Sequence, residues 1–380
     1  ISDSVREHGA ESVAFYLSGQ LLTEDYYIAN KLAKGFIGTP HVDTNSRLCM
    51  SSAVAAHKRA FGEDCVPGCY EDLELADLLV LAGSNASWAH PVLYQRMSAA
   101  RRQGRRVVVI DPRKTATADL ADLHLQLRPG TDTLLFNGLL VWLHDHGALA
   151  EDYLAEHCNG FEETLAIARS CAPSVQAVAR GCDLAVEEVE CFYRWFADTG
   201  RTVTAFSQGI NQSVAGTDKA NAIINCHLAT GRVGRPGASP FSLTGQPNAM
   251  GGREVGGLAN TLAAHMDYDT PGALLRVSDF WHSEKMARGP GHKAVDLFEA
   301  VHRGEIRVLW VMGTNPAVSL PGSERIHQAL SRCQTLIVSD CVAQTDTTQF
   351  ADILLPAAGW GEKDGTVTNS ERRISRQRRF

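Results

Sequence analysis

Long hydrophobic runs, an excess of basic charge and a cysteine framework are all missing from this 380-residue sequence. No apolar stretch approaches the roughly 20 residues that a transmembrane helix requires, and the start carries no signal-peptide pattern. The formal net charge of −7 argues against nucleic acid or an anionic membrane as the main partner. The ten cysteines are scattered, which is typical of reduced thiols in a cytoplasmic protein rather than of a disulfide-stapled fold.

What remains is an ordinary globular composition, with 44% hydrophobic and 21% charged residues. The length predicts two or three domains, each able to bury a core of its own. The chain begins at Ile1 rather than Met and opens directly into an element, so we expect it to be a segment of a longer protein.

One pattern of strands and turns occurs twice. In the first copy, residues 77–85 (DLLVLAGSN) read as a buried strand that runs into a Gly-Ser-Asn turn. A helix is predicted over 90–104, and a second strand over 106–113 contains Asp111. The alternating residues 123–127 predict a short third strand.

The second copy lies near the other end of the chain. Residues 307–316 (RVLWVMGTNP) predict a strand that runs into a Gly-Thr-Asn turn, followed by a helix over 323–333 and a strand over 335–341. That last strand reaches Asp340, 27 residues after the turn glycine, where the first copy has a spacing of 28. An accidental match of turn, acid and spacing is improbable.

A third and weaker pairing joins residues 12–20 to residues 202–212, each a strand that enters a Gly/Gln turn. The repeats predict an α/β protein with two doubly wound, mostly parallel Rossmann-like domains related by pseudo-symmetry. The C-terminal copy needs partner strands, which the start of the chain can supply. We therefore expect a split domain, residues 1–45 plus 265–380, with residues 46–264 inserted as the other domain.

The strand-end turns are candidate binding sites. In doubly wound sheets ligands bind beyond the carboxyl ends of the strands, and an acid that ends the next strand can bond a ribose or a base. Neither turn has the G-x-G-x-x-G pattern of nicotinamide-binding folds. Gly-Ser-Asn and Gly-Thr-Asn still offer N–H groups and polar side chains that suit a pyrophosphate. A turn that binds nothing is the alternative for either copy, but the matched pair favours two dinucleotides.

Several motifs stand in order along the whole chain: SGQ, NSRLCMSSAV, GSNASWAHP, IDPR, PGTD, INCHLATGRVGRPGASPFSLTGQPNAMGGREVG, GTNPAVSLP and ADILLPAAGWGEKDGTVTNSERR. Together they resemble the molybdopterin oxidoreductases of the dimethyl-sulfoxide-reductase family, and within it most closely the bacterial nitrate reductases. The resemblance implies one molybdenum held by two molybdopterin guanine dinucleotides, each domain binding one. It also implies an upstream [4Fe–4S] cluster and a downstream barrel-like domain, so we expect this segment alone to be inactive.

The resemblance assigns roles to individual positions. Cys49 would ligate molybdenum, Met50 would pack beside the metal, and Arg253 would guide nitrate to it. Residues expected to hold the cofactor are Gln20, Asn45, Gly83, Ser84, Asn85, Asp111, Pro112, Arg113, Gly130, Thr131, Asp132, Gln208, Gly209, Gln212, Gly313, Thr314, Asn315, Ser339, Asp340 and Lys363.

Each of the three catalytic candidates has a structural alternative. Cys49 stands directly ahead of small residues that predict a helix start, and a helix N-terminus favours a thiolate; a small buried side chain is the other interpretation. Met50 could be an ordinary core methionine. Arg253 could pair with Glu254 or lie on the surface.

The implied reaction is the reduction of nitrate to nitrite by oxygen-atom transfer, with two electrons and two protons releasing the oxygen as water. The implied role is assimilatory and cytoplasmic, with a periplasmic role left open. The partners would be nitrate and an electron donor protein or reductase subunit: NADH-linked, ferredoxin or flavodoxin.

Two rival interpretations share the fold. Formate dehydrogenases of the family usually have His after the metal-ligating residue, where Met50 stands here. A noncatalytic relative, similar to the large iron–sulfur subunit of respiratory complex I, would not need Cys49 together with both turns and both strand-end acids.

Overall fold

The computed structural model describes residues 1–380, which divide into two compact units. Unit 1 comprises residues 1–48 and 246–380, and unit 2 comprises residues 49–245. Residues 46–48 and 246–264, which the sequence analysis assigns to the insert, therefore belong to unit 1. There the Asn248 side chain donates to the Leu21 carbonyl and accepts from the Thr368 amide, both at 2.7 Å.

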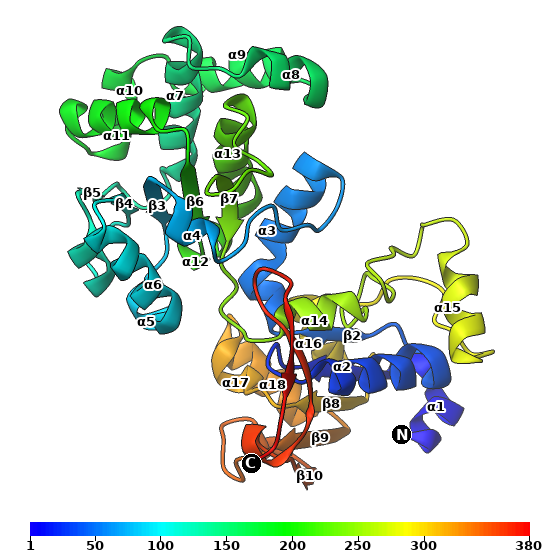
Figure 1. Ribbon diagram of the computed structural model, residues 1–380. Helices are drawn as coiled ribbons and strands as arrows, with labels where there is room; N and C mark the ends of the chain where they lie inside the picture. Colours follow the sequence, from blue (N-terminus) through cyan, green and yellow to red (C-terminus); the bar gives the residue numbers. More distant parts are fainter. The chain divides into compact units, whose positions relative to one another are not determined.

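Unit 2 contains most of helix α3 (Ser46–Phe61; Figure 1), whose first three residues are assigned to unit 1. Its further elements are α4 (Asp72–Leu75), β3 (Leu78–Ala82), α5 (Ala86–Ala89), α6 (Pro91–Arg102), β4 (Arg106–Ile110), β5 (Leu123–Leu125), α7 (Asp132–Asp145), α8 (Glu151–His157), α9 (Phe161–Cys171), α10 (Val175–Cys182), α11 (Val186–Asp198), β6 (Thr202–Phe206), α12 (Gln208–Asn211), α13 (Gly216–Ala229) and β7 (Ser239–Ser242).

The sheet of unit 2 has the order β5-β4-β3-β6-β7, with every strand pair parallel. Successive residues of a strand point to opposite faces. Leu78 and Val80 accordingly pack with α7, α10, α11 and α13, whereas Leu79 and Leu81 pack with α6. Burial on both faces explains why β3 and β4 read as continuous apolar runs.

Unit 1 contains α1 (Ser2–His8), β1 (Val13–Leu17), α2 (Thr23–Asn30) with a π-helical continuation (Lys31–Ile37), β2 (Val42–Thr44), α14 (Ala249–Glu254), α15 (Ala273–Trp281), α16 (Ala294–Arg303), β8 (Val308–Met312), α17 (Pro316–Ser319), α18 (Ser323–Arg332), β9 (Thr335–Asp340), β10 (Ile353–Pro356), β11 (Gly365–Thr368) and β12 (Ile374–Gln377). β11 and β12 form a separate antiparallel hairpin.

The main sheet of unit 1 has the order β10-β9-β8-β1-β2 and is also parallel throughout. Ala14 and Tyr16 pack with α16 and α18 on one face. Val13 and Phe15 pack with α2 on the other face. This unit is therefore a second three-layer α/β sandwich.

The two sheets match strand for strand. β3, β4 and β5 take the places of β8, β9 and β10, and β6 takes the place of β1. The predicted α/β fold with two related, parallel, doubly wound layers is confirmed. The weaker pairing of residues 12–20 with 202–212 corresponds to β1 and β6.

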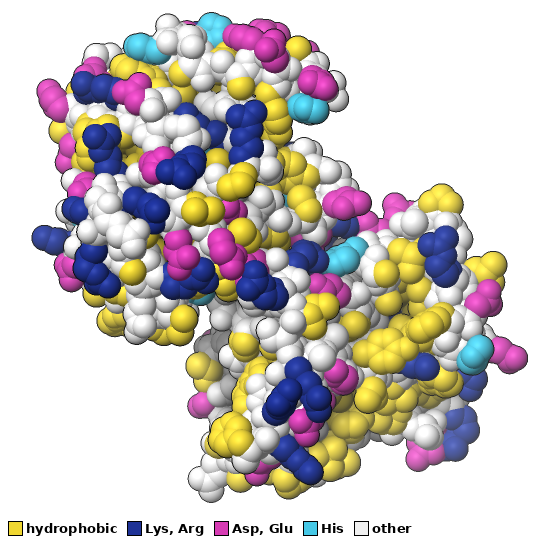
Figure 2. All heavy atoms as spheres, viewed as in Figure 1, with side chains coloured by type: hydrophobic (Ala, Val, Ile, Leu, Met, Phe, Trp, Pro, Cys, Tyr) yellow, Lys and Arg dark blue, Asp and Glu magenta, His cyan; other side chains and the backbone are white.

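The surface carries charges of both signs. Lys and Arg side chains are interspersed with Asp and Glu over the face shown in Figure 2, as a net charge of −7 in 380 residues allows. None of the helices combines the length and the apolar character needed to cross a bilayer.

A glycine with left-handed backbone geometry follows the central strand of each sheet, β3 and β8. Gly83 has φ +55° and Gly313 has φ +64°, a region that side chains disfavour. The Gly83 amide donates to the Ile110 carbonyl at 2.9 Å, and the Gly313 amide donates to the Ser339 carbonyl at 2.8 Å. Each turn is therefore tied to the end of the neighbouring strand.

Replacing Gly83 by Ala should destabilise the protein more than the same change at Gly104. An added Cβ at Gly83 would lie 2.7 Å from Gly209 Cα, whereas Gly104 (φ +90°) has no heavy atom within 4 Å of that position. Left-handed strain costs about 1–2 kcal/mol at either site, and the clash adds about 1–3 kcal/mol at Gly83. Urea unfolding measures both free energies; equal losses would contradict the close approach.

Histidine burial predicts a loss of stability in acid. His227 is fully buried with Nε2 2.8 Å from Thr204 Oγ1, and burial, aided by Arg232, lowers its pKa to about 3. The folded protein therefore keeps His227 neutral, while the unfolded chain takes up a proton as the pH falls below about 6.5. This contribution to the free energy of unfolding is present above pH 6.5 and is lost as the pH falls toward 3.

In His227→Gln the side chain at this position cannot take up a proton. Between pH 5.5 and 4 the slope of its unfolding free energy against pH should therefore be smaller than the wild-type slope, the difference being about 1.4 kcal/mol per pH unit. Urea melts at several pH values measure the slope. The exposed His8→Gln serves as the control and should keep the wild-type slope. An unchanged slope in His227→Gln would show that this histidine does not contribute.

Candidate functional site

A pocket of about 540 Å³ lies at the carboxyl ends of β1, β8 and β9 in unit 1, and we call it the strand-end pocket. Its lining includes four of the predicted cofactor residues, Gln20, Gly313, Ser339 and Lys363. Apolar walls come from residues that the sequence analysis did not single out, among them Trp310 and Met312 of β8. Hydrogen bonding of Trp310 Nε1 to Ser339 Oγ at 2.9 Å fixes one wall.

Lys363 reaches this pocket as one half of an ion pair. Its Nζ lies 2.7 Å from the Asp25 carboxylate, with both side chains partly exposed. Asp25 lies in the first turn of α2 and also accepts from the Leu22 amide at 3.1 Å. The ammonium is therefore held at the pocket wall with donors left for a ligand oxygen.

Asn45 joins two of the strand-end turns of unit 1. Its Oδ1 accepts from the Gly19 amide at 2.7 Å, and its Nδ2 donates to Thr314 Oγ1 at 3.1 Å. Hydrogen bonds of Asn45 therefore link the turn that follows β1 to the turn that follows β8.

Asn85 and Asn315 have equivalent partners in the two units. The Thr117 hydroxyl donates to Asn85 Oδ1 at 2.9 Å, and the Thr347 hydroxyl donates to Asn315 Oδ1 at 2.7 Å. The amide oxygen of each asparagine thus closes its own turn, which a local sequence motif does not reveal.

Asp111 and Asp340 also match. Asp111 Oδ1 accepts from the Arg113 amide at 2.8 Å, and Asp340 Oδ1 accepts from the Val342 amide at 3.0 Å. Each carboxylate is oriented by a turn of its own backbone. Pro112 and Arg113 next to Asp111 are exposed, as are Gly130 and Gln212 elsewhere in unit 2.

The turn after β3 contains a buried hydroxyl without a hydrogen-bond partner, Ser84 Oγ. Gly83 beside it approaches Gly209 so closely that neither residue has room for a Cβ, and the Gly209 amide donates to the Gly83 carbonyl at 2.9 Å. Buried polar atoms normally have partners. The hydroxyl therefore offers a place for a ligand atom.

Lys219 is a buried cation that the sequence analysis missed. Its Nζ lies 2.7 Å from Asp132 Oδ2 and 3.4 Å from the Gly209 carbonyl, and both charged side chains are almost fully buried. Asp132 begins α7, and the hydroxyl of Thr131 before it donates to the Arg128 carbonyl at 2.6 Å. One ammonium thus joins two predicted cofactor-binding segments. Lys219 belongs to no sequence motif, so only the three-dimensional structure reveals its contacts.

Cys49 lies within helix α3 rather than ahead of it. The helix begins at Ser46, whose amide donates to Thr44 Oγ1 at 2.9 Å, so the start predicted directly after Cys49 is four residues too late. The thiol is 7% exposed and shares a core cluster with Met50. Gln208 Nε2 lies 2.8 Å from Cys49 Sγ, and Asn211 Nδ2 lies 3.7 Å from Met50 Sδ.

Arg253 lies in α14 of unit 1 and does not line the strand-end pocket. It is 6% exposed, with Nη2 2.8 Å from Met250 Sδ, so the interpretation as a surface arginine is wrong. The neighbouring Glu254 accepts from the Thr368 hydroxyl at 2.9 Å and pairs with Arg372 at 3.7 Å.

A fully buried lysine binds the loop after α14. Lys34 Nζ donates to the carbonyls of Gly256, Leu258 and Thr261 at 2.7–2.8 Å. Burial lowers the pKa of Lys34 to about 7, while the Asp43 carboxylate opposes that shift. Lys34 therefore holds the segment that follows Arg253.

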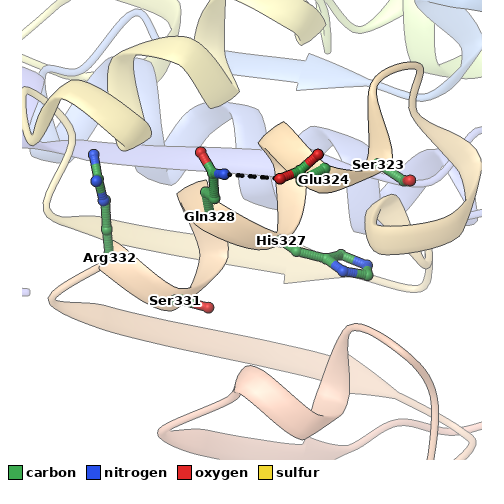
Figure 3. A pocket seen from close by; sticks show the side chains of 6 residues that line it. All are labelled: Ser323, Glu324, His327, Gln328, Ser331 and Arg332. Carbon is green, nitrogen blue, oxygen red and sulfur yellow. Dashed lines mark hydrogen bonds between the residues drawn. The ribbon is translucent and has the colours of Figure 1, made fainter.

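A second hollow, of about 490 Å³, lies on α18 (Figure 3). Its six labelled residues all come from that single helix, and Gln328 donates to Glu324 at 3.5 Å. None of the six is an apolar residue, and none comes from a strand. The strand-end pocket is the better candidate for a cofactor.

The donors and walls described above fit a phosphate-bearing cofactor with a large planar ring system. In unit 1, the strand-end pocket combines an ammonium, hydroxyl groups and aromatic walls. In unit 2, the unpartnered Ser84 hydroxyl stands beside the left-handed Gly83. The Cys49 thiol is a soft sulfur donor of the kind that suits transition metals.

Comparison with known proteins gives a consistent result. The family described as Molybdopterin oxidoreductase matches residues 1–380. A nitrate reductase of Klebsiella oxytoca is 57% identical and a nitrate reductase of Shewanella frigidimarina is 54% identical, with 100% and 99% of this chain covered. The chain spans only 43% and 40% of those two relatives.

The fold agrees with that of a solved structure. The acetylene hydratase from Pelobacter acetylenicus matches 99% of this chain and 54% of its own chain, with a TM-score of 0.72 at 18% identity. That likeness concerns the fold alone. The family match over all 380 residues shows that this chain belongs to the molybdopterin oxidoreductases, a family built around a molybdenum–molybdopterin cofactor.

Proposed function

We propose that the whole protein reduces nitrate to nitrite at a molybdenum held by two molybdopterin guanine dinucleotides. The observation that carries the proposal is the duplication of the strand-end turn, with Gly83 and Gly313 in the same conformation and bonded in the same way. Two equivalent turns supply two dinucleotide sites. The family match and the two relatives called nitrate reductases support the same reading.

Each unit would bind one dinucleotide. In unit 1 the Gly313 turn, Ser339 and the Lys363 ammonium would hold one pyrophosphate and its guanosine. In unit 2 the Ser84 hydroxyl, the Asp111 carboxylate and the α7 start at Asp132 would hold the other. Backbone N–H groups and a fixed ammonium are suited to phosphate oxygens.

Cys49 would ligate the molybdenum as a thiolate. Bound there, the cofactor supplies two-electron oxygen-atom transfer, so nitrate, two electrons and two protons give nitrite and water. The protein orients the substrate and keeps bulk water away. Met50, 3% exposed in the same core cluster as Cys49, would form an apolar wall beside the metal.

Arg253 would attract nitrate through its buried guanidinium, since a planar fork of N–H donors matches an oxyanion. Lys34 would keep the loop after Arg253 in place through three carbonyl contacts. Electrons would come from an NADH-linked subunit, ferredoxin or flavodoxin by way of a [4Fe–4S] cluster outside this chain. An assimilatory, cytoplasmic role belongs to the same proposal.

Formate oxidation is the second candidate, because the family includes formate dehydrogenases. It is disfavoured by Met50, which has no titratable group where the formate enzymes place a histidine. A side chain that cannot take up a proton suits oxygen-atom transfer better than proton abstraction.

The full-length protein should contain molybdenum and reduce nitrate with reduced viologen, while formate should give no turnover. Cys49→Ser should lower nitrate reduction by roughly 100-fold, since changing even the hydrogen-bond partner of a metal ligand costs about 10- to 100-fold. Metal analysis and a nitrite assay measure the two quantities.

Cys226→Ala is the matched control, since Cys226 is a fully buried cysteine of unit 2 away from the turns. It should retain both molybdenum and activity. A wild-type protein without molybdenum, or one that oxidises formate in preference to nitrate, would overturn the proposed function.

A further inference from the structure

The side chain of Gln208 contacts the sulfur of Cys49 directly. Nε2 and Sγ are 2.8 Å apart, a contact between an amide donor and a sulfur acceptor. Gln208 is the first residue of α12, at the carboxyl end of β6, and Cys49 lies in the first turn of α3. The contact therefore joins two elements of unit 2 at a thiol that is only 7% exposed.

The orientation of the Gln208 amide is set by its other end. The hydroxyl of Ser207 donates to Gln208 Oε1, so the oxygen faces Ser207 and the NH₂ group faces the sulfur. Ser207 itself is 2% exposed and lies 3.2 Å from the Leu243 carbonyl. The hydroxyl has one proton, and the Gln208 amide oxygen is the nearer of its two acceptors, which favours the orientation that turns the NH₂ group toward the sulfur.

Hydrogen bonds to a ligating thiolate withdraw electron density from the sulfur, and such bonds tune the reduction potential of the metal. We propose that Gln208 is a positioning residue that orients the Cys49 sulfur and raises the reduction potential of the metal bound to it. The inference rests on the proposed function only in taking Cys49 as the metal ligand.

A purely structural role for Gln208 makes a different prediction. An amide that only fills space or satisfies Ser207 would change stability when removed, and the potential of the bound metal would stay the same. The potential and the metal's spectrum therefore separate the two roles.

The test uses full-length, molybdenum-loaded enzyme and the variant Gln208→Met, which keeps the length of the side chain and removes the donor. We expect the molybdenum midpoint potential, from a redox titration followed by electron paramagnetic resonance, to fall. A tenfold change in the ratio of reduced to oxidised metal corresponds to about 59 mV for a one-electron step. The Mo(V) signal should change as well.

Ser207→Ala and Gln103→Met complete the set. Ser207→Ala frees the amide to rotate, so a smaller shift in the same direction is expected, and this variant decides the matter if Gln208→Met loses its metal. Gln103 is exposed at the end of α6, and Gln103→Met should leave potential and spectrum unchanged.

Loaded Gln208→Met enzyme with the wild-type potential and spectrum would overturn the inference and leave the proposed function intact. If Gln208→Met is unloaded, a wild-type potential in Ser207→Ala has the same consequence. Full molybdenum content and nitrate reduction in Cys49→Ser would instead overturn the assignment of Cys49 on which the inference rests.

Discussion

The left-handed turn at the end of each central strand is the constraint on which the candidate sites depend. Gly83 follows β3 and Gly313 follows β8, and both have a positive φ. The Gly83 amide donates to the last carbonyl of β4, and the Gly313 amide donates to the Ser339 carbonyl of β9. At Gly83 the backbone of Gly209 is too close for any Cβ. This turn places the Ser-Asn or Thr-Asn pair that follows each glycine at the carboxyl edge of a parallel sheet, where ligands of doubly wound folds bind.

A buried lysine holds a segment of each unit in place. Lys219 joins Asp132 to the Gly209 carbonyl in unit 2, and in unit 1 Lys34 binds three carbonyls of the loop after α14. Removing either Lys219 or Asp132 would leave an uncompensated buried charge, which costs about 3–5 kcal/mol. The polar groups are therefore oriented before any ligand arrives, and that preorganisation is what a site for an anionic cofactor requires.

Much of the fold could be predicted because its signals are local. β3, β4, β8 and β9 are apolar runs because helices cover both faces of each sheet, and the repeated spacing from glycine to acid marks one unit used twice. The sequence placed the start of α3 too late, because the hydroxyl of Thr44 that caps Ser46 is not part of a standard capping pattern. Residues 246–264 belong to unit 1 because Asn248 bonds residues on both sides of the insert, Leu21 and Thr368.

By itself the sequence determined the fold class, the internal repeat and the family, since these depend on hydrophobic periodicity and on motifs that are contiguous along the chain. Only the tertiary structure decided which partner each polar side chain takes. Asn85 and Asn315 close their turns on threonines about 30 residues away, and Gln208 meets Cys49 across 159 residues of chain. Such pairings form when distant segments pack against one another, and the geometry of that packing is not encoded in any short stretch of residues.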